Sequence, residues 1–197
     1  MGGDLLRGYG SRLGELDTMI VAGSEDERGL KGMLALAQDA IQKQPRPVSS
    51  IALRLDGSEW VPWLPEPDHP LFNEFKLRQV QTFGEDYKEQ KELLDKLHEK
   101  RGEDLFVATY GGIQNKETGR VTTFSVWCGG ITSLLPRTDL IAFIERNGDA
   151  SRMFGWDRVM EVAGGLLQPL AIYPPRYGVS EFPINSQFAA MGEPIDL

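Results

Sequence analysis

The chain has 197 residues, of which 41% are hydrophobic and 25% charged, proportions that suit a soluble globular protein and exclude a disordered or collagen-like chain. Its 21 basic and 29 acidic residues give a net charge of −8, which argues against nucleic-acid binding because phosphate contacts require a basic surface. A single cysteine, together with the lack of a signal peptide and of a long apolar run, predicts a cytoplasmic protein that does not span a membrane.

The first 44 residues predict a pair of helices. Apolar residues spaced by three or four between residues 4 and 20 line one helix face, although several glycines weaken this helix. Ser24-Glu-Asp-Glu27 is typical of a capping box at the start of a second helix, which ends before a Pro-Arg-Pro connector. We assign residues 1–44 to an N-terminal helical pair that could dock as an arm and residues 48–197 to an α+β core, together forming one structural domain.

A strand, a turn and a long helix are predicted next. Apolar and polar side chains alternate between residues 48 and 56, with Leu53 and Leu55 on one face, as is typical of a strand. A turn of sequence Asp-Gly-Ser leads into a second short strand over 60–63, and a proline-rich loop follows it. Apolar residues then line one stripe over 71–100, which predicts one long helix whose second half has a charged, solvated face.

The middle of the chain predicts a sheet. Four stretches rich in β-branched and aromatic residues follow the long helix: 105–110, 120–128, 131–135 and 139–145. Short connections between them favour antiparallel pairing, so we expect a meander. A last helix begins at Trp156, and the chain after Pro169 is expected to be irregular. These elements predict an α+β fold in which an antiparallel sheet packs against a long helix and a C-terminal helix, with the helical pair at the N-terminus.

The sequence contains no recognisable catalytic or cofactor-binding motif. A nucleophilic serine elbow, a phosphate-binding glycine loop and paired metal-ligating histidines are all missing. Glu66, Asp68 and His69 share one loop and could form a weak metal site, but a solvated loop explains them more simply. We therefore assign no catalytic residue, no metal and no cofactor, and we disfavour an enzyme.

Aromatic side chains beside arginines are the remaining candidates for a functional surface. Tryptophan, tyrosine and arginine dominate binding energy at protein interfaces, and prolines reduce the entropy that a segment loses on binding. Packing of the same side chains in the core is the alternative. The candidate interaction or pocket residues are Trp60, Trp63, Arg137, Trp156, Tyr173, Arg176 and Tyr177.

These observations predict a protein that acts by binding another protein, as an adaptor, an inhibitor or an immunity-type protein, or by self-association as a homodimer. The acidic chain would favour a basic partner through electrostatic steering. The alternative is a small-molecule or anion-binding domain, or an enzyme, with a pocket between the sheet and the helices where Arg120, Arg137 or Arg176 holds an anion. We expect neither a nucleic acid nor a membrane as a partner.

Overall fold

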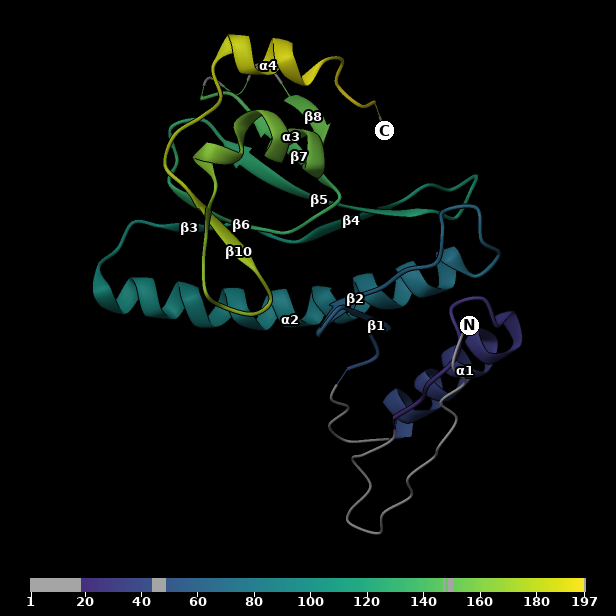
Figure 1. Ribbon diagram of the computed structural model, residues 1–197. Coiled ribbons are helices and arrows are strands. Elements are labelled where there is room, and N and C mark those ends of the chain that lie inside the picture. The colour runs from purple at the N-terminus through teal and green to yellow at the C-terminus, as the bar shows by residue number, and fades with distance from the viewer. Residues whose placement is uncertain (1–18, 44–48, 147, 149–150, 197) are drawn as a thin grey trace. The chain divides into compact units, whose positions relative to one another are not determined.

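The computed structural model describes residues 19–43, 49–146, 148 and 151–196, and it divides into two compact units, Met1–Thr82 and Phe83–Leu197 (Figure 1). The boundary between the units lies inside the long helix α2 (Phe72–Arg101), which begins and ends within a residue of its predicted bounds. Most of the first predicted helix and the Pro-Arg-Pro connector lie outside the described residues.

The first unit begins with helix α1 (Glu27–Lys43). The backbone N–H of Gly29 donates a hydrogen bond of 3.0 Å to Oδ1 of Asp26. Asp26 therefore caps the helix, and the prediction that Ser24 does so is wrong. The reason is position, because the side chain directly before the first helical residue is the one that reaches the orphan N–H groups of the first turn.

The core of the first unit is small. Trp63 packs edge-on against Phe75 of α2, with 5.7 Å between the ring centroids. Ala52 and Met33 pack against the same cluster. Its fully enclosed members are Leu30, Leu34, Leu71 and Phe75.

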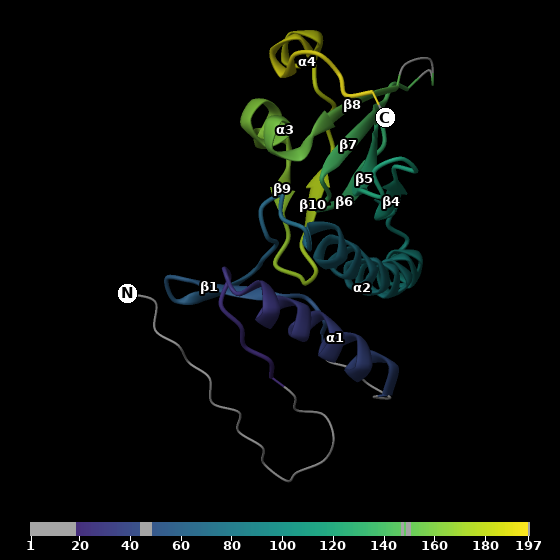
Figure 2. The ribbon, with the colours of Figure 1, turned by 90° about the vertical axis from the view of Figure 1, so that its right-hand side faces the viewer.

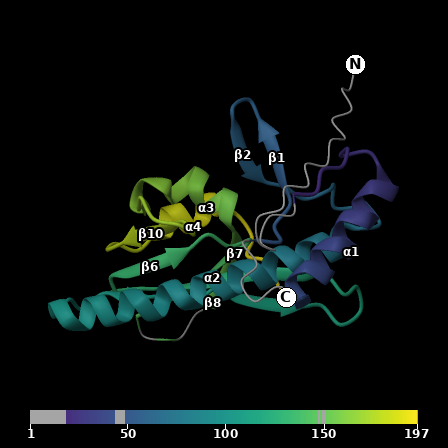
Figure 3. The ribbon, with the colours of Figure 1, turned by 90° about the horizontal axis from the view of Figure 1, so that it is seen from below.

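An antiparallel hairpin completes the first unit. Strands β1 (Leu53–Asp56) and β2 (Glu59–Pro62) are joined by a two-residue loop. Gly57 adopts a φ of 61° in this loop, a left-handed conformation that glycine reaches without steric cost. Among the described residues no third strand pairs with either edge of this hairpin (Figure 3).

The described strands of the second unit form two four-stranded sheets, with the orders β3-β6-β10-β9 and β4-β5-β7-β8. Helices α3 and α4 lie on one side of β5, β7 and β8 (Figure 2), and a 3₁₀ turn, η1, follows α3. The bounds are β3 (Phe106–Val107), β4 (Gly111–Gln114), β5 (Val121–Cys128), β6 (Ser133–Pro136), β7 (Leu140–Ile144), β8 (Ser151–Gly155), α3 (Trp156–Ala163), η1 (Gly164–Leu166), β9 (Gln168–Pro169), β10 (Arg176–Val179) and α4 (Asn185–Met191).

The α+β class, with a mid-chain sheet packed against helices, is confirmed, but the strand pairing differs from a simple meander. β5 pairs parallel with β7, with Phe124 opposite Leu140, because β6 between them in sequence joins the other sheet. The detour through β6 gives the chain enough length for a parallel crossover. The segment after Pro169 is not irregular either, since it forms β10, which pairs with both β6 and β9, and helix α4.

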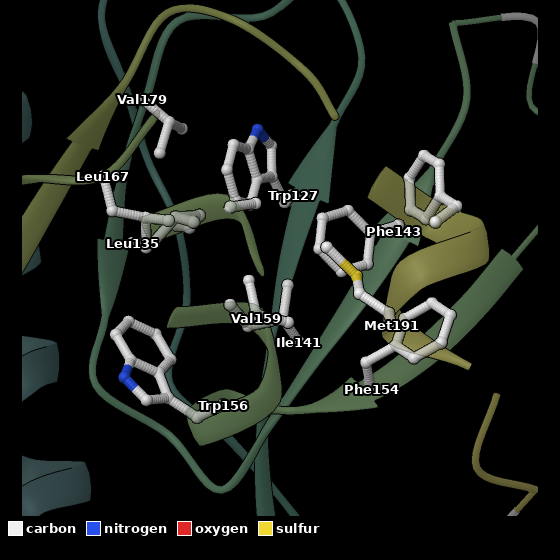
Figure 4. Close-up of a cluster of buried hydrophobic side chains, with 13 residues drawn as sticks. Trp127, Leu135, Ile141, Phe143, Phe154, Trp156, Val159, Leu167, Val179 and Met191 are labelled. Atoms are coloured by element: carbon white, nitrogen blue, oxygen red, sulfur yellow. The ribbon is translucent and has the colours of Figure 1, made fainter. Parts of the chain in front are cut away.

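One aromatic core joins the sheets and helices of the second unit (Figure 4). The ring of Phe143 on β7 lies 5.3 Å from Trp127 on β5 and 5.2 Å from Phe188 on α4, measured between centroids. The side chain of Met191 lies beside Phe143 in Figure 4. Buried side chains of this size contribute about 1.5–3 kcal/mol each, so this core holds the second unit together.

No helix in the described part of the chain combines the length and apolarity that a membrane crossing requires.

Candidate functional site

An exposed apolar surface lies on the β1–β2 hairpin of the first unit. Leu53 and Leu55 are each 52% exposed, and Trp60 is 58% exposed. Leu55 lies directly opposite Trp60, and Leu53 lies opposite Pro62. Since directly opposite residues of an antiparallel pair share one face, these residues form a continuous apolar surface, which we call the hairpin face. It consists of Leu53, Leu55, Trp60 and Pro62.

The hairpin face points away from the core of the first unit. At the base of the hairpin, the backbone N–H of Trp63 donates a hydrogen bond of 2.8 Å to the carbonyl of Ala52. Both of these side chains pack into the core cluster around Phe75. Successive side chains of a strand point to opposite faces, so the leucines next along β1 point outward.

The candidates Trp60 and Trp63 therefore have different environments. Trp60 belongs to the hairpin face, whereas Trp63 is half-buried against Phe75. Their odd separation along one strand is the sequence signal that places them on opposite faces.

Three further candidates meet in the second unit. The guanidinium of Arg137 lies over the ring of Trp156, 4.8 Å from its centroid, and the Trp156 ring packs 5.0 Å from that of Tyr177. Arg137 also donates hydrogen bonds to Oδ1 of Asp157 at 2.9 Å and to the carbonyl of Thr138 at 2.7 Å. These partners hold the half-buried guanidinium against α3 and satisfy much of its hydrogen-bonding capacity.

Arg176, another candidate, is fully buried, with 0% exposure, so its side chain is not part of an exposed surface. Its Nε donates to Oε1 of Gln90 at 2.5 Å, and one terminal nitrogen donates to the carbonyls of Ala108 and Leu134 at 2.8 and 2.9 Å. Burial lowers the pKa of Arg176 to about 10, which is still well above neutral pH. The charged guanidinium therefore links α2, β6 and the residue after β3, and this is a packing role. Figure 1 shows β3 and β6 running alongside this part of α2.

Tyr173 and Tyr177, the candidates on either side of Arg176 in sequence, differ from each other in exposure. Tyr173 is 69% exposed, whereas Tyr177 lies on β10 and is half-buried against Trp156. The two prolines between these tyrosines do not by themselves indicate an exposed surface. The pairing of β10 with β6 decides which side chains of the segment are covered.

Two tyrosines that connect these elements were not among the residues predicted from the sequence. The hydroxyl of Tyr87 on α2 donates to the carbonyl of Pro175 at 2.7 Å and accepts from the backbone N–H of Arg137 at 3.1 Å. Its ring stacks on that of Tyr110 with 4.9 Å between centroids. Burial raises the pKa of Tyr87 to about 12 and raises the pKa of Tyr110 as well, so both phenols are neutral at physiological pH. Tyr87 falls on the apolar stripe of the long helix, which was its only sequence signal.

An open hollow of about 260 Å³ lies beside these two tyrosine rings, between the second half of α2 and the link from β3 to β4. Its charged lining residues are two lysines, Lys88 and Lys91, and two acids, Glu92 and Asp95. Lys91 forms an ion pair of 2.9 Å with Asp95, whereas Lys88 has no ion-pair partner in the described residues. None of the arginines that the sequence nominated for anion binding belongs to this lining.

The described residues contain no group of three or more His, Cys, Asp or Glu side chains placed to hold a metal ion. His69, from the loop considered for a metal, instead accepts a hydrogen bond of 3.1 Å at Nδ1 from the backbone N–H of Leu71, next to the start of α2. Comparisons of the chain with protein-family models, with curated proteins and with solved structures found no match.

Proposed function

We propose that the protein acts by binding another protein through the hairpin face. The observation that carries this proposal is the continuous apolar surface of Leu53, Leu55, Trp60 and Pro62 on a hairpin whose base is anchored to the core by Trp63. Contiguous exposed apolar patches on soluble proteins commonly mark interaction sites. Tryptophan is also one of the residues that most often dominate binding energy. An adaptor or an inhibitor would use such a surface.

The net charge of the chain points to the chemistry of the partner. A charge of −8 favours encounter with a basic protein, since long-range attraction raises the association rate. The apolar hairpin face would then supply most of the affinity once the two proteins meet. Association should accordingly slow as the salt concentration is raised, while dissociation changes little.

Substitution of Trp60 tests the proposal. Trp60→Ala should weaken partner capture from a native lysate at least about tenfold, because truncating a central interface tryptophan typically costs 2 kcal/mol or more. Leu36→Ala is the matched control, since Leu36 is also an exposed apolar residue but lies on α1. Wild type and Leu36→Ala should retain the same proteins, and Trp60→Ala should lose them. Equal retention by all the variants would exclude the hairpin face as the binding surface.

A second function, binding of a small anion, is favoured by the hollow in the second unit. Lys88 lies there without an ion-pair partner in the described residues, beside the neutral rings of Tyr87 and Tyr110. A small aromatic carboxylate would place its ring beside Tyr110 and its charge on Lys88, since Tyr87 is buried behind Tyr110.

Thermal unfolding in the presence of benzoate tests this second function. At about 100 times its dissociation constant a ligand adds roughly 2.7 kcal/mol to folded-state stability, which raises the melting temperature by several degrees. Lys88→Ala should abolish the rise, whereas Lys96→Ala, an exposed lysine farther along α2, should preserve it. A rise that survives Lys88→Ala would place the anion elsewhere.

A further inference from the structure

We propose that the free edge of β1 pairs antiparallel with β1 of a second copy of this chain, with Leu55 opposite its own counterpart. The hairpin thereby becomes the centre of a homodimer. This inference goes beyond the proposed function, because it concerns the edge of the hairpin rather than the hairpin face. A partner protein could bind the face of a monomer, so each proposal can fail without the other.

The geometry of the hairpin determines which backbone groups lie on the free edge of β1. The hydrogen bond from Trp63 to Ala52 makes that pair a hydrogen-bonded one. Hydrogen-bonded and non-hydrogen-bonded pairs alternate along an antiparallel ladder, so Arg54 bonds to β2 whereas Leu53 and Leu55 do not. The N–H and C=O groups of Leu53 and Leu55 therefore point away from β2. They form a short unpaired edge, which is a template for another strand.

The edge of β2 is less suited to pairing. Pro62 lies opposite Leu53 at a non-hydrogen-bonded position, where a backbone N–H would point to the free side of β2. Proline has no N–H, and it is a residue that natural proteins place on edge strands to discourage further pairing. Trp60 is then the one residue of β2 whose backbone N–H points to the free side of the strand, away from β1. Strand addition is thus favoured at β1.

Charge selects the register of the pairing. When Leu55 lies opposite its counterpart, Arg54 of each copy lies opposite Asp56 of the other, which gives two oppositely charged pairs related by the two-fold axis. These are non-hydrogen-bonded pairs, in which opposite side chains approach most closely. A register centred on Arg54 would instead place two arginines opposite each other, and one centred on Asp56 would place two aspartates opposite each other. Both of these alternatives are repulsive, and a register centred on Leu53 would place Arg54 opposite Ala52 and so form no oppositely charged pair.

The side chains that would form these pairs are available. Arg54 and Asp56 are exposed, and neither has an ion-pair partner in the described part of the chain. Within its own hairpin Asp56 lies directly opposite Glu59, and like charges in that position destabilise a hairpin. An arginine from a second copy on the other side of Asp56 would offset this repulsion.

Pairing also changes the hairpin face. The two copies together form the strand order β2-β1-β1-β2, and the hairpin faces of both copies lie on the same side of this sheet. A two-stranded hairpin is marginal on its own, whereas sheets of three or more strands with an apolar face can be stable. The dimer would therefore both stabilise the hairpin and present a partner with an apolar surface twice as large.

Charge reversal in the full-length protein tests the proposal. Arg54→Asp and Asp56→Arg should each weaken the dimer about tenfold or more, because each replaces two attractive cross-strand pairs with two repulsive ones. An equimolar mixture of the two variants should dimerise again, since every aspartate of one variant then faces an arginine of the other. Sedimentation velocity over a concentration series measures these equilibria. Arg28→Asp, at an exposed arginine of α1, makes the same change in net charge as Arg54→Asp but away from the hairpin, and it should dimerise as wild type does.

Several results would overturn the inference. A wild-type chain that stays monomeric at every concentration excludes the dimer. Dimers that survive both single reversals place the contact elsewhere. If both variants are monomeric but their mixture is monomeric too, the register is wrong. Partner capture repeated with the reversal variants reports separately on the hairpin face, because Leu53 and Trp60 are unchanged in them.

Discussion

The two units use their apolar side chains in opposite ways. In the second unit, Phe143 and its aromatic neighbours are enclosed in one core, and even the guanidinium of Arg176 is fully covered. In the first unit the core is small, and the leucines of β1 and Trp60 on β2 face solvent. The aromatic residues of the second unit therefore stabilise its own fold. In the first unit an apolar surface remains available for binding.

The largest expected effect contrasts one side chain from each unit. Phe143→Ala should lower the free energy of unfolding by about 4 kcal/mol, since it leaves a cavity at the centre of the aromatic core. Trp60→Ala should change it by less than about 0.5 kcal/mol, because its side chain is mainly in solvent. Urea unfolding followed by circular dichroism measures both changes. A loss for Trp60→Ala as large as that for Phe143→Ala would contradict the comparison.

The buried arginine should have the next largest effect. Arg176→Met keeps much of the side-chain volume but removes the donors to Gln90, Ala108 and Leu134. The Gln90 and Ala108 oxygens then lose this donor, while the Leu134 carbonyl keeps its bond from the backbone N–H of Ala108, so the free energy of unfolding should fall by about 3 kcal/mol. Tyr173→Ala, in the same segment but exposed, is the control and should be nearly neutral. Wild-type stability in Arg176→Met would show that only the volume of the arginine matters.

The phenol of Tyr87 should make stability depend on pH in alkaline solution. Its pKa is raised from 10.0 to about 12 in the folded protein, so between these values the folded state holds a proton that the unfolded state has lost. The stabilisation of the folded state by the neutral Tyr87 phenol is complete below pH 10 and is lost as the pH rises to about 12. The stability difference between wild type and Tyr87→Phe should therefore decrease by about 2 kcal/mol over this range.

Comparison with Tyr87→Phe at each pH cancels the contributions of groups that do not interact with the Tyr87 phenol. Arg176, whose pKa is lowered to about 10 mainly by burial, changes stability with the opposite sign at alkaline pH, and Tyr87 partly offsets that lowering, so Arg176→Met with and without Tyr87→Phe serves as the second control. Urea unfolding at several pH values provides the measurement. A stability difference that stays constant with pH would mean that the Tyr87 phenol ionises as readily in the folded protein as in the unfolded protein.

Arg137 should give the smallest effect. Its contact with the Trp156 ring and its ion pair with the exposed Asp157 together should contribute about 1 kcal/mol or less. Arg137→Gln should lower the melting temperature of the second unit slightly, and Arg137→Lys should recover part of the loss through its positive charge. A loss of several kcal/mol would show that Arg137 is as deeply integrated as Arg176.

Local periodicity was sufficient to predict the long helices and several strands. The three- and four-residue spacings that define α1 and α2 are set by neighbours in sequence, so both helices could be located within a few residues. Strand β4 could not be located in this way, because Gly111, considered without its neighbours in space, indicates a turn. In the structure it lies opposite Phe124, and a Cβ at Gly111 would come within 2.7 Å of the phenylalanine ring. Only the partner strand explains why glycine occupies this position.

The candidate site was predictable to a smaller degree. Trp60 was identified because tryptophan, tyrosine and arginine dominate binding energy at interfaces, but the same reasoning grouped it with Trp63 and with Arg176. Which of these is exposed depends on contacts between distant segments, namely Trp63 with Phe75 and Arg176 with Gln90. Alternation along β1 shows that its leucines share a face but not which face is covered.

Pro62 determines how far the hairpin could assemble. A strand edge with a full set of donors on both sides would recruit further copies without limit and grow into a fibril. With proline on β2 and a free edge on β1, a sheet built from two copies ends on both sides in the strand that resists addition. Replacing Pro62 with a β-branched residue would supply the missing N–H. The consequence would be a protein at risk of open-ended polymerisation rather than a closed pair.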